Sequence, residues 1–194
     1  MNKLTQLRTI IASLDETLVK AFCERATFKV NADLYQHITP ALCVAETATC
    51  FRTASTMASR THIIRSLYVH TLLPLLCDSG LNEDRRKCIA VDTACITALA
   101  QRLNLSVHVA SLKMEEISES LRLPLQLHDP ELMEQAITNH AVEAEVIDHI
   151  LTMSHKRHTQ DVLAQKIGSI YEQWLIPISR KIQVNGLLAL PYSR

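Results

Sequence analysis

Apolar residues recur at spacings of three and four near the start of the chain, which is the pattern of an amphipathic helix. It predicts a helix over residues 4–27. The stripe comprises Leu4, Leu7, Ile11, Leu14, Leu18, Phe22 and Cys23. Residues 61–77 have a second helical pattern, which Asp78-Ser79-Gly80 closes with turn-forming residues. Between these two helices, residues 29–60 are irregular and contain Pro40.

Three more helical segments follow a charged loop over 81–88. The first runs from about Val91 to about Leu121, and Pro124 and Pro130 then bracket a linker. The second covers residues 131–154, with a break expected near Asn139.

The last long helix is predicted from about Gln160 to about Leu188. Pro177 lies inside it and should bend it, because proline removes a backbone donor. The pattern therefore predicts five or six helices and no strand of consequence.

Composition supports this all-α reading. The chain has 194 residues but only 3 glycines and 4% aromatic residues. Tight turns favour glycine and strands favour aromatic residues, so both kinds of structure should be scarce. No repeat, low-complexity tract or Pro/Ser-rich linker divides it, so residues 1–194 are expected to form one multi-helix bundle. The formal net charge is zero, which removes any general electrostatic case for binding nucleic acid or an anionic membrane. An anionic ligand would need local arginines.

We expect a cytoplasmic protein that does not cross a membrane. The N-terminus lacks the apolar core of a signal peptide, and the apolar stretch 67–77 is too short to span a bilayer. In a reducing compartment the cysteines should be free thiols. They are Cys23, Cys43, Cys50, Cys77, Cys88 and Cys95.

Familiar catalytic machinery is missing from the sequence. It contains no Gly-rich phosphate loop and no G-x-S-x-G elbow. His155 and His158 are the closest histidine pair, but Lys156 and Arg157 lie between them, and cations are poor neighbours for a divalent metal. We therefore expect neither a metal site nor a cofactor.

Several polar residues are spaced to share helix faces. Residues eleven apart lie almost three full turns along a helix, and residues four apart lie about one turn apart. The pairs are Arg102 with Lys113, Asn139 with Glu143, and Ser179 with Gln183. Arg8 lies beside the apolar stripe of the first helix. Spacing alone leaves all of these as ordinary surface residues or ion pairs.

Four segments resemble the eukaryotic-type chorismate mutases of fungi and plants, which belong to the all-helical mutase class. They are LRTIIASLDETLVKAFCERATFKVNADLY, SLYVHTLLPLL, DTACITALAQRLNLSVHVASLKMEEI, and the stretch from ITNHAVEAEVIDHIL to IYEQWLIPISRKIQVNGLLAL. The run Y-x-x-W-L-I-P-[IL]-[ST] is particularly specific. The segments occur in the family's order and cover most of the chain.

The resemblance implies a rearrangement of chorismate to prephenate and a role for each polar residue. Arg8 and Arg102 match arginines that bind the two carboxylates, and Lys113 matches a lysine that reaches a carboxylate and the ether oxygen. Glu143 matches the acceptor of the ring hydroxyl. The remaining matches are Asn139, a polar pocket residue; Ser179, a hydroxyl near a carboxylate; and Gln183, which hydrogen-bonds the ether oxygen. Family members form homodimers, so a homodimer is expected.

These residue types suit the reaction, a Claisen rearrangement within one molecule. It requires no nucleophile, proton relay or metal. The protein must hold a flexible dianion in a reactive shape and stabilise negative charge on the ether oxygen as the C–O bond breaks. Arginine forks suit the first task because two parallel N–H bonds fix a carboxylate's orientation.

Two departures from the family lead to predictions. The first is Gln183, which stands where fungal and plant enzymes usually have Glu. Because an amide donates a hydrogen bond at any pH, activity should be flat over about pH 5–8. The stretch after the first helix is short, and Arg86-Lys87 lies where regulated relatives have a Gly-Ser pair at their tryptophan and tyrosine site. We therefore expect no regulation by these amino acids.

Three alternatives share parts of this pattern. An isochorismate pyruvate lyase has a similar fold and dianionic substrate, although Glu143 favours the mutase. A helical interaction module without activity would lack competent pocket residues, and all seven positions here are competent. A secreted mutase would share the chemistry and differ in location.

Overall fold

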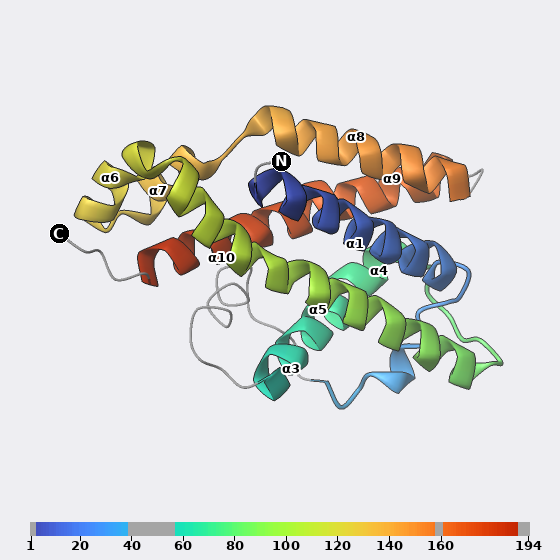
Figure 1. Cartoon of the computed structure of the whole chain (residues 1–194). Coiled ribbons are helices and arrows are strands. Elements are labelled where there is room, and N and C mark those ends of the chain that lie inside the picture. Colours follow the sequence, from blue (N-terminus) through green and yellow to red (C-terminus); the bar gives the residue numbers. More distant parts are fainter. Residues whose placement is uncertain (1–2, 39–56, 158–160, 190–194) are drawn as a thin grey trace.

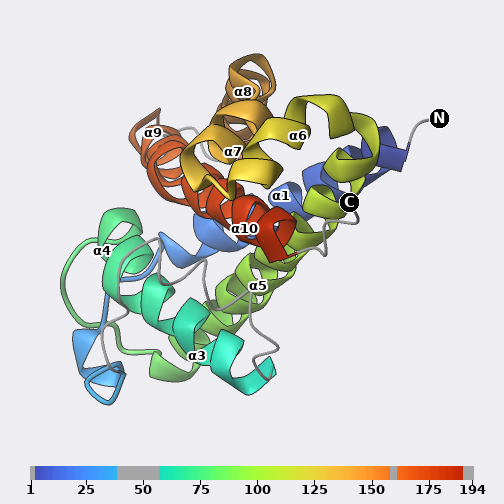
Figure 2. The same ribbon diagram turned by 90° about the vertical axis from the view of Figure 1, so that its left-hand side faces the viewer.

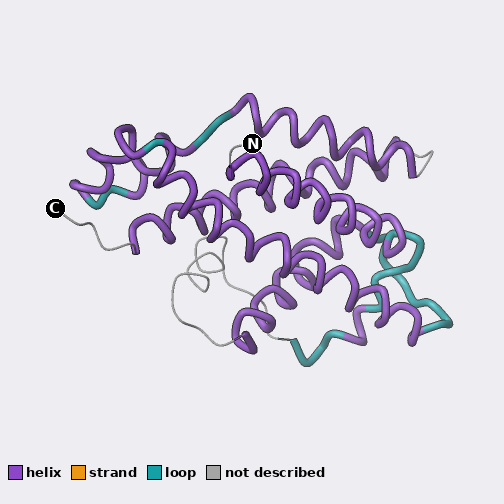
Figure 3. The backbone as a smooth tube through the Cα atoms, in the orientation of Figure 1, coloured by secondary structure: helices purple, strands orange, loops and turns teal. Residues whose placement is uncertain are grey.

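The computed structural model describes residues 3–38, 57–157 and 161–189, and its regular structure in these ranges is entirely helical (Figure 3). Helices α1 (Lys3–Arg25) and α5 (Arg85–Glu116) run antiparallel side by side through the bundle (Figure 1). The first predicted helix is therefore confirmed, and it ends two residues early. Among the described helices, none is long and apolar enough to cross a membrane.

The second predicted helix is also confirmed, and it begins earlier than expected. It consists of α3 (Met57–Leu67), a π-helical turn (Tyr68–Leu72) and α4 (Leu73–Leu76). The wide turn ends two residues before Pro74, which cannot donate a backbone hydrogen bond and crowds the carbonyl four residues earlier. Of the irregular segment before this helix, residues 39–56 lie outside the described residues, and 32–34 form a single 3-10 turn.

The start of α5 corrects the expected loop over 81–88. The helix begins at Arg85 rather than near Val91, because the Asp84 carboxylate caps it by accepting from the Lys87 backbone N–H at 2.9 Å. The three charged residues at 85–87 suggested a loop, but charged residues are good helix formers when a cap precedes them.

The far end of α5 gives a second correction. It stops at Glu116, and α6 (Ser118–Leu127) begins after a break at Ile117. Pro124 lies inside α6 and Pro130 opens α7 (Pro130–Ile137), so the stretch expected to be a linker is largely helical. Burial of apolar side chains explains the exception: Leu121, Pro124 and Leu125 are buried, and this packing outweighs the one backbone bond that proline removes.

The break expected near Asn139 is confirmed, because it separates α7 from α8 (His140–Arg157). Asn139 caps α8, with its Oδ1 accepting from the Val142 N–H at 3.2 Å. Helix α9 (Asp161–Ile170) returns antiparallel along α8 (Figures 1 and 2). Gly168 lets these two helices approach closely, since a Cβ there would meet Leu151 at 2.8 Å.

The last helix contains a π-helical turn (Tyr171–Leu175) between α9 and α10 (Ile176–Ala189). Pro177 comes two residues after this turn, as Pro74 does in the earlier helix. The predicted disturbance at Pro177 thus takes the form of a widened turn, which removes the clash without ending the helix.

Two hydrophobic clusters meet along α5 and α10. On α5, Leu103 belongs to the main cluster and Ala110 to the second one. On α10, Ile182 and Val184 divide in the same way. Four of the polar residues selected from the sequence lie on α5 and α10 around this junction, where they line a cavity: Arg102, Lys113, Ser179 and Gln183.

Candidate active site

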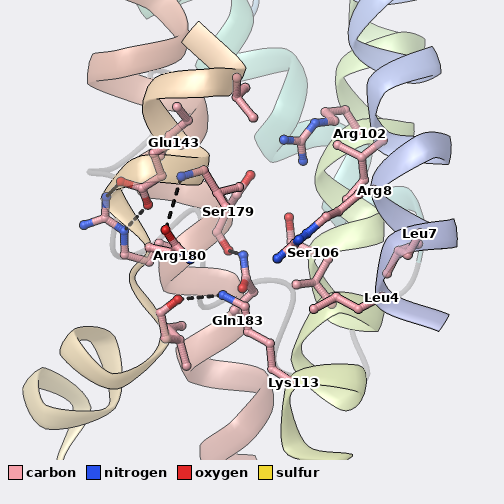
Figure 4. Close-up of a pocket in the computed structure, with 17 residues that line it drawn as sticks. Leu4, Leu7, Arg8, Arg102, Ser106, Lys113, Glu143, Ser179, Arg180 and Gln183 are labelled. Carbon is pink, nitrogen blue, oxygen red and sulfur yellow. Dashed lines mark hydrogen bonds and ion pairs between the residues drawn. The ribbon is translucent and has the colours of Figure 1, made fainter. Parts of the chain in front are cut away.

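One cavity of about 150 Å³ is lined by residues from α1, α5, α7, α8 and α10, together with the loop before α8 (Figure 4). All seven residues selected from the sequence line it, although they span most of the chain. They are Arg8, Arg102, Lys113, Asn139, Glu143, Ser179 and Gln183. The wall between them is mainly aliphatic and includes Leu7, Val109 and Val146.

The Arg102 side chain is positioned by an ion pair with the buried carboxylate of Asp15. Its Nε donates to Asp15 Oδ1 on α1 at 2.7 Å, and the Tyr171 hydroxyl donates to the same oxygen at 3.0 Å. Burial raises the pKa of Tyr171 well above its usual value, and Asp15 adds to the effect, so this hydroxyl stays a donor. Asp15 was not predicted as a site residue, and its partner is 87 residues away in the chain.

Lys113 lies in a partly desolvated position. Its ammonium donates to the Ile137 carbonyl at 2.7 Å. Burial lowers its pKa to about 8; Glu143 opposes the shift, whereas Arg8 and Arg180 add to it. Lys113 and Arg102 do share one face of α5, as their spacing predicted.

Arg8 approaches the cavity from α1. Figure 4 shows its guanidinium directed toward the space between α5 and α10, on the same side as Arg102. The residue as a whole is exposed, so its charge lies at the mouth of the cavity.

The opposite wall carries an ion-pair network that the sequence analysis missed. Arg180 donates two hydrogen bonds to the Glu143 carboxylate, from Nε to Oε1 at 3.2 Å and from Nη2 to Oε2 at 3.0 Å. Its Nη1 also reaches Glu134 at 3.3 Å, and Lys181 pairs with Glu134 at 2.5 Å. Arg180 is three residues before Gln183, so the helical spacing that selected Gln183 could have found it.

Several polar atoms in the cavity wall have no partner. Gln183 Nε2 donates to the Ser179 carbonyl at 3.2 Å. Its Oε1 and the hydroxyls of Ser179 and Ser106 are buried, and none has a hydrogen-bond partner in the described structure. Ser106 was also not selected from the sequence. Unpaired buried polar groups cost free energy, so a cavity lined with them suits a polar ligand.

The histidines and cysteines show no metal-binding arrangement within the described residues, where no three potential ligands gather. His155 pairs with Asp161 at 3.3 Å, a carboxylate that the sequence analysis did not connect with it, and His158 lies outside the described residues. Four cysteines are buried and free, as expected: Cys23, Cys77, Cys88 and Cys95. Cys43 and Cys50 also lie outside the described residues.

Comparisons with solved structures support the fold. A chorismate mutase from Candida albicans in complex with L-Trp superposes with a TM-score of 0.76 at 17% identity, covering 96% of this chain and 90% of that one. The chloroplast chorismate mutase of Zea mays has a TM-score of 0.76 at 18% identity, covering 96% and 95%. At such identities the agreement establishes the all-helical architecture.

Curated sequences lead to the same family. A chorismate mutase of Trichoderma parareesei is 26% identical over 144 residues, which is 64% of this chain and 54% of that protein. Chorismate mutase 2 of Zea mays, named as cytosolic, is 24% identical over 139 residues, covering 64% and 55%. The matched region spans about half the length of these relatives. The family model for chorismate mutase type II matches residues 85–184, more than half of the chain, and the chain therefore belongs to this family.

Proposed function

We propose that this protein is a chorismate mutase that rearranges chorismate to prephenate. The observation that supports it best is the convergence of seven residues, from four helices and one loop, on a single cavity. Six are of the type that the family resemblance implies at their positions, and the seventh, Gln183, replaces the usual Glu with an amide that can also donate. A chain that had kept only the fold would have no reason to retain all of them.

The substrate's two carboxylates would bind to the cationic wall. Arg8 and Arg102 supply guanidinium groups on one side, and Lys113 adds a third cation on the same helix as Arg102. Arginine can bind a carboxylate through two parallel bonds, so it fixes the carboxylate's direction as well as its charge. The Asp15 contact leaves the outer nitrogens of Arg102 available, since Nε alone donates to Asp15.

The ether oxygen would lie between Lys113 and Gln183. Donors at this oxygen stabilise the transition state more than the substrate, because negative charge grows there as the C–O bond breaks. A rate enhancement of ~10⁶ corresponds to about 8 kcal/mol. Two preorganised donors of roughly 3–4 kcal/mol each, with orientation added, could supply that amount.

The remaining polar residues would orient the ring and its side chain. Glu143 can accept from the ring hydroxyl, and Arg180 keeps its carboxylate aimed along the wall. Asn139 stands at the start of the same helix, one turn earlier. The unpaired hydroxyl of Ser179 can donate to a carboxylate oxygen.

The decisive experiment follows the loss of chorismate absorbance with purified protein and identifies prephenate as the product. Arg102→Ala should reduce kcat/KM by ~10²–10³, as expected for loss of a preorganised donor. Arg122→Ala, an exposed arginine on α6, serves as the matched control and should behave as wild type. A folded wild type that leaves chorismate unchanged would refute the proposal. Pyruvate released from isochorismate would then favour the lyase.

We further propose that tryptophan and tyrosine do not regulate this enzyme. Regulated relatives have a Gly-Ser pair where this chain has Arg86-Lys87, and both of these residues are exposed in the first turn of α5. By contrast, the structural neighbour from Candida albicans is a complex with L-Trp. A severalfold change in rate at millimolar tryptophan or tyrosine would contradict the proposal.

A homodimer in the cytoplasm is the assembly and location that we propose. The support is the family resemblance and the maize relative named as cytosolic. Light scattering on the purified protein should give twice the monomer mass of 21.8 kDa.

A further inference from the structure

Two buried serines in this protein differ in how their hydroxyls are satisfied. Ser106 on α5 and Ser154 on α8 are each 1% exposed. The Ser154 hydroxyl donates to the Ile150 carbonyl one turn earlier, at 2.8 Å. The Ser106 hydroxyl has no partner in the described part of the chain. Ser106 therefore lacks the back-bond that a serine inside a helix can form.

The unpaired hydroxyl of Ser106 lines the cavity. Of five buried side-chain polar atoms without a partner among the described residues, three belong to its wall, on Ser106, Ser179 and Gln183. Ser179 and Gln183 already have proposed contacts with the substrate. Ser106 faces them from α5 (Figure 4), and no role has yet been assigned to it.

Helical geometry sets which part of the ligand Ser106 would meet. Ser106 is four residues after Arg102 and seven before Lys113, so the three side chains project within a narrow angular range along α5. Its hydroxyl therefore lies between the guanidinium expected to hold a carboxylate and the ammonium expected to reach the ether oxygen.

We propose that Ser106 is a further substrate-binding residue, whose hydroxyl donates a hydrogen bond to an oxygen of the bound dianion between Arg102 and Lys113. This inference rests on the proposed function. Its physical basis is that the hydroxyl is desolvated without compensation in the free protein, and an oxygen-rich ligand satisfies it. The residue contributes to affinity and is tolerated despite a small cost in stability.

Stability and binding should therefore change in opposite directions in Ser106→Ala. Its kcat/KM for chorismate should fall about 3- to 10-fold, and its Kd for prephenate, measured by calorimetry, should rise by a similar factor. Its urea midpoint should stay the same or rise, because the variant removes an unpaired buried hydroxyl. In Ser154→Ala, by contrast, the urea midpoint should fall while kcat/KM and the prephenate Kd stay unchanged.

Other results would overturn the inference. If the parent is active and Ser106→Ala has the same kcat/KM and Kd as the wild type, Ser106 does not bind substrate, and the proposed function still stands. A lowered urea midpoint with unchanged binding would make Ser106 structural. If the wild type neither converts chorismate nor binds prephenate, both proposals fall. Should the alanine variant fail to fold, Ser106→Cys keeps the side-chain shape with a weak donor and must show the same loss of affinity.

Discussion

Helices α1 and α5 are joined by two buried Arg–Asp pairs that look alike and differ in one respect. Asp15 on α1 holds Arg102 on α5, and Arg25 on α1 holds Asp92 on α5. The Nε–Oδ1 distances are 2.7 and 2.6 Å, and every side chain involved is buried. The Arg25–Asp92 pair lies at one end of the contact, where α1 ends and α5 begins, and the Asp15–Arg102 pair lies near the middle of both helices.

In the Arg25–Asp92 pair, both side chains make several further hydrogen bonds within the protein. Beyond Asp92, the Arg25 guanidinium donates to the carbonyls of Lys29 at 3.1 Å and Val30 at 3.2 Å. Asp92 in turn accepts from the hydroxyls of Tyr35 and Tyr68. Burial raises the pKa of both tyrosines, and their contact with Asp92 adds to the shift. This end of the contact fastens the chain after α1 to the bundle.

In the Asp15–Arg102 pair, the arginine keeps donors that no described protein group uses. Among the described residues Arg102 donates only from Nε, to Asp15, while its other nitrogens adjoin the cavity. The same kind of ion pair therefore anchors the chain at one end of the helix contact and presents donors to a ligand near its middle. A buried arginine marks a binding site only when its hydrogen-bonding capacity is not exhausted by the protein.

The largest expected effect comes from breaking the Arg25–Asp92 pair. Arg25→Met should lower the free energy of unfolding by about 3–5 kcal/mol, because it leaves Asp92 charged, buried and without a cation. Arg102→Met should lower it by a smaller amount, because water can enter the cavity beside Asp15. Urea unfolding of both variants measures the difference. Equal losses would show that the two pairs are not distinct in the way proposed.

A second prediction concerns the cavity's opposite wall. Arg180→Ala should reduce kcat/KM about 10- to 100-fold, since Glu143 would lose its two charged hydrogen bonds and repel the dianion. Lys181→Ala is the matched control, because Lys181 contacts Glu134 and does not line the cavity. Steady-state kinetics on both variants provides the test. A similar loss in the two would assign the effect to general repulsion rather than to Glu143.

The smallest expected effect is on the pH profile. Lys113, with a pKa of about 8 in the free protein, loses its charge as pH rises through that value. The kcat/KM should therefore fall about tenfold between pH 7 and pH 9, because this parameter reports the free enzyme. The kcat should stay flat over about pH 5–8, because Gln183 does not titrate. In Gln183→Glu, kcat should instead decline as pH rises, since only a protonated carboxyl can donate.

A result of the opposite sign would be informative. If kcat of the wild type fell steeply above neutrality, Gln183 would not be the donor to the ether oxygen. If kcat/KM stayed constant to pH 9, the charge of Lys113 would not contribute to binding.

Much of the fold could be predicted from local pattern. The first helix, the break near Asn139 and the disturbance at Pro177 were all anticipated, because each depends on apolar period, capping or proline within a few residues. The errors lie near residues 85 and 117–130. The charged residues suggested a loop at the first place, but the N-cap at Asp84 starts a helix there. The prolines suggested a linker at the second, but the burial of Pro124 and its neighbours stabilises a helix.

The candidate site divides in the same way. Periodicity put Arg102 and Lys113 on one helix face, and family resemblance, rather than periodicity, suggested their roles. Ser106 shares that face of α5, and Arg180 lies three residues before Gln183 on α10. Both were passed over, because spacing cannot show which polar residues lack a partner or which carboxylate they meet.

The sequence by itself determined the helices, the polar faces along them and the membership of a family with a known fold, because these depend on neighbouring residues or on ordered motifs. Tertiary structure alone decided which faces meet. Asp15 and Arg102 are 87 residues apart, and Glu143 and Arg180 are 37 apart. Such contacts form only when helices pack, since packing removes water from one face at a time and leaves each buried polar group to find its partner across the bundle.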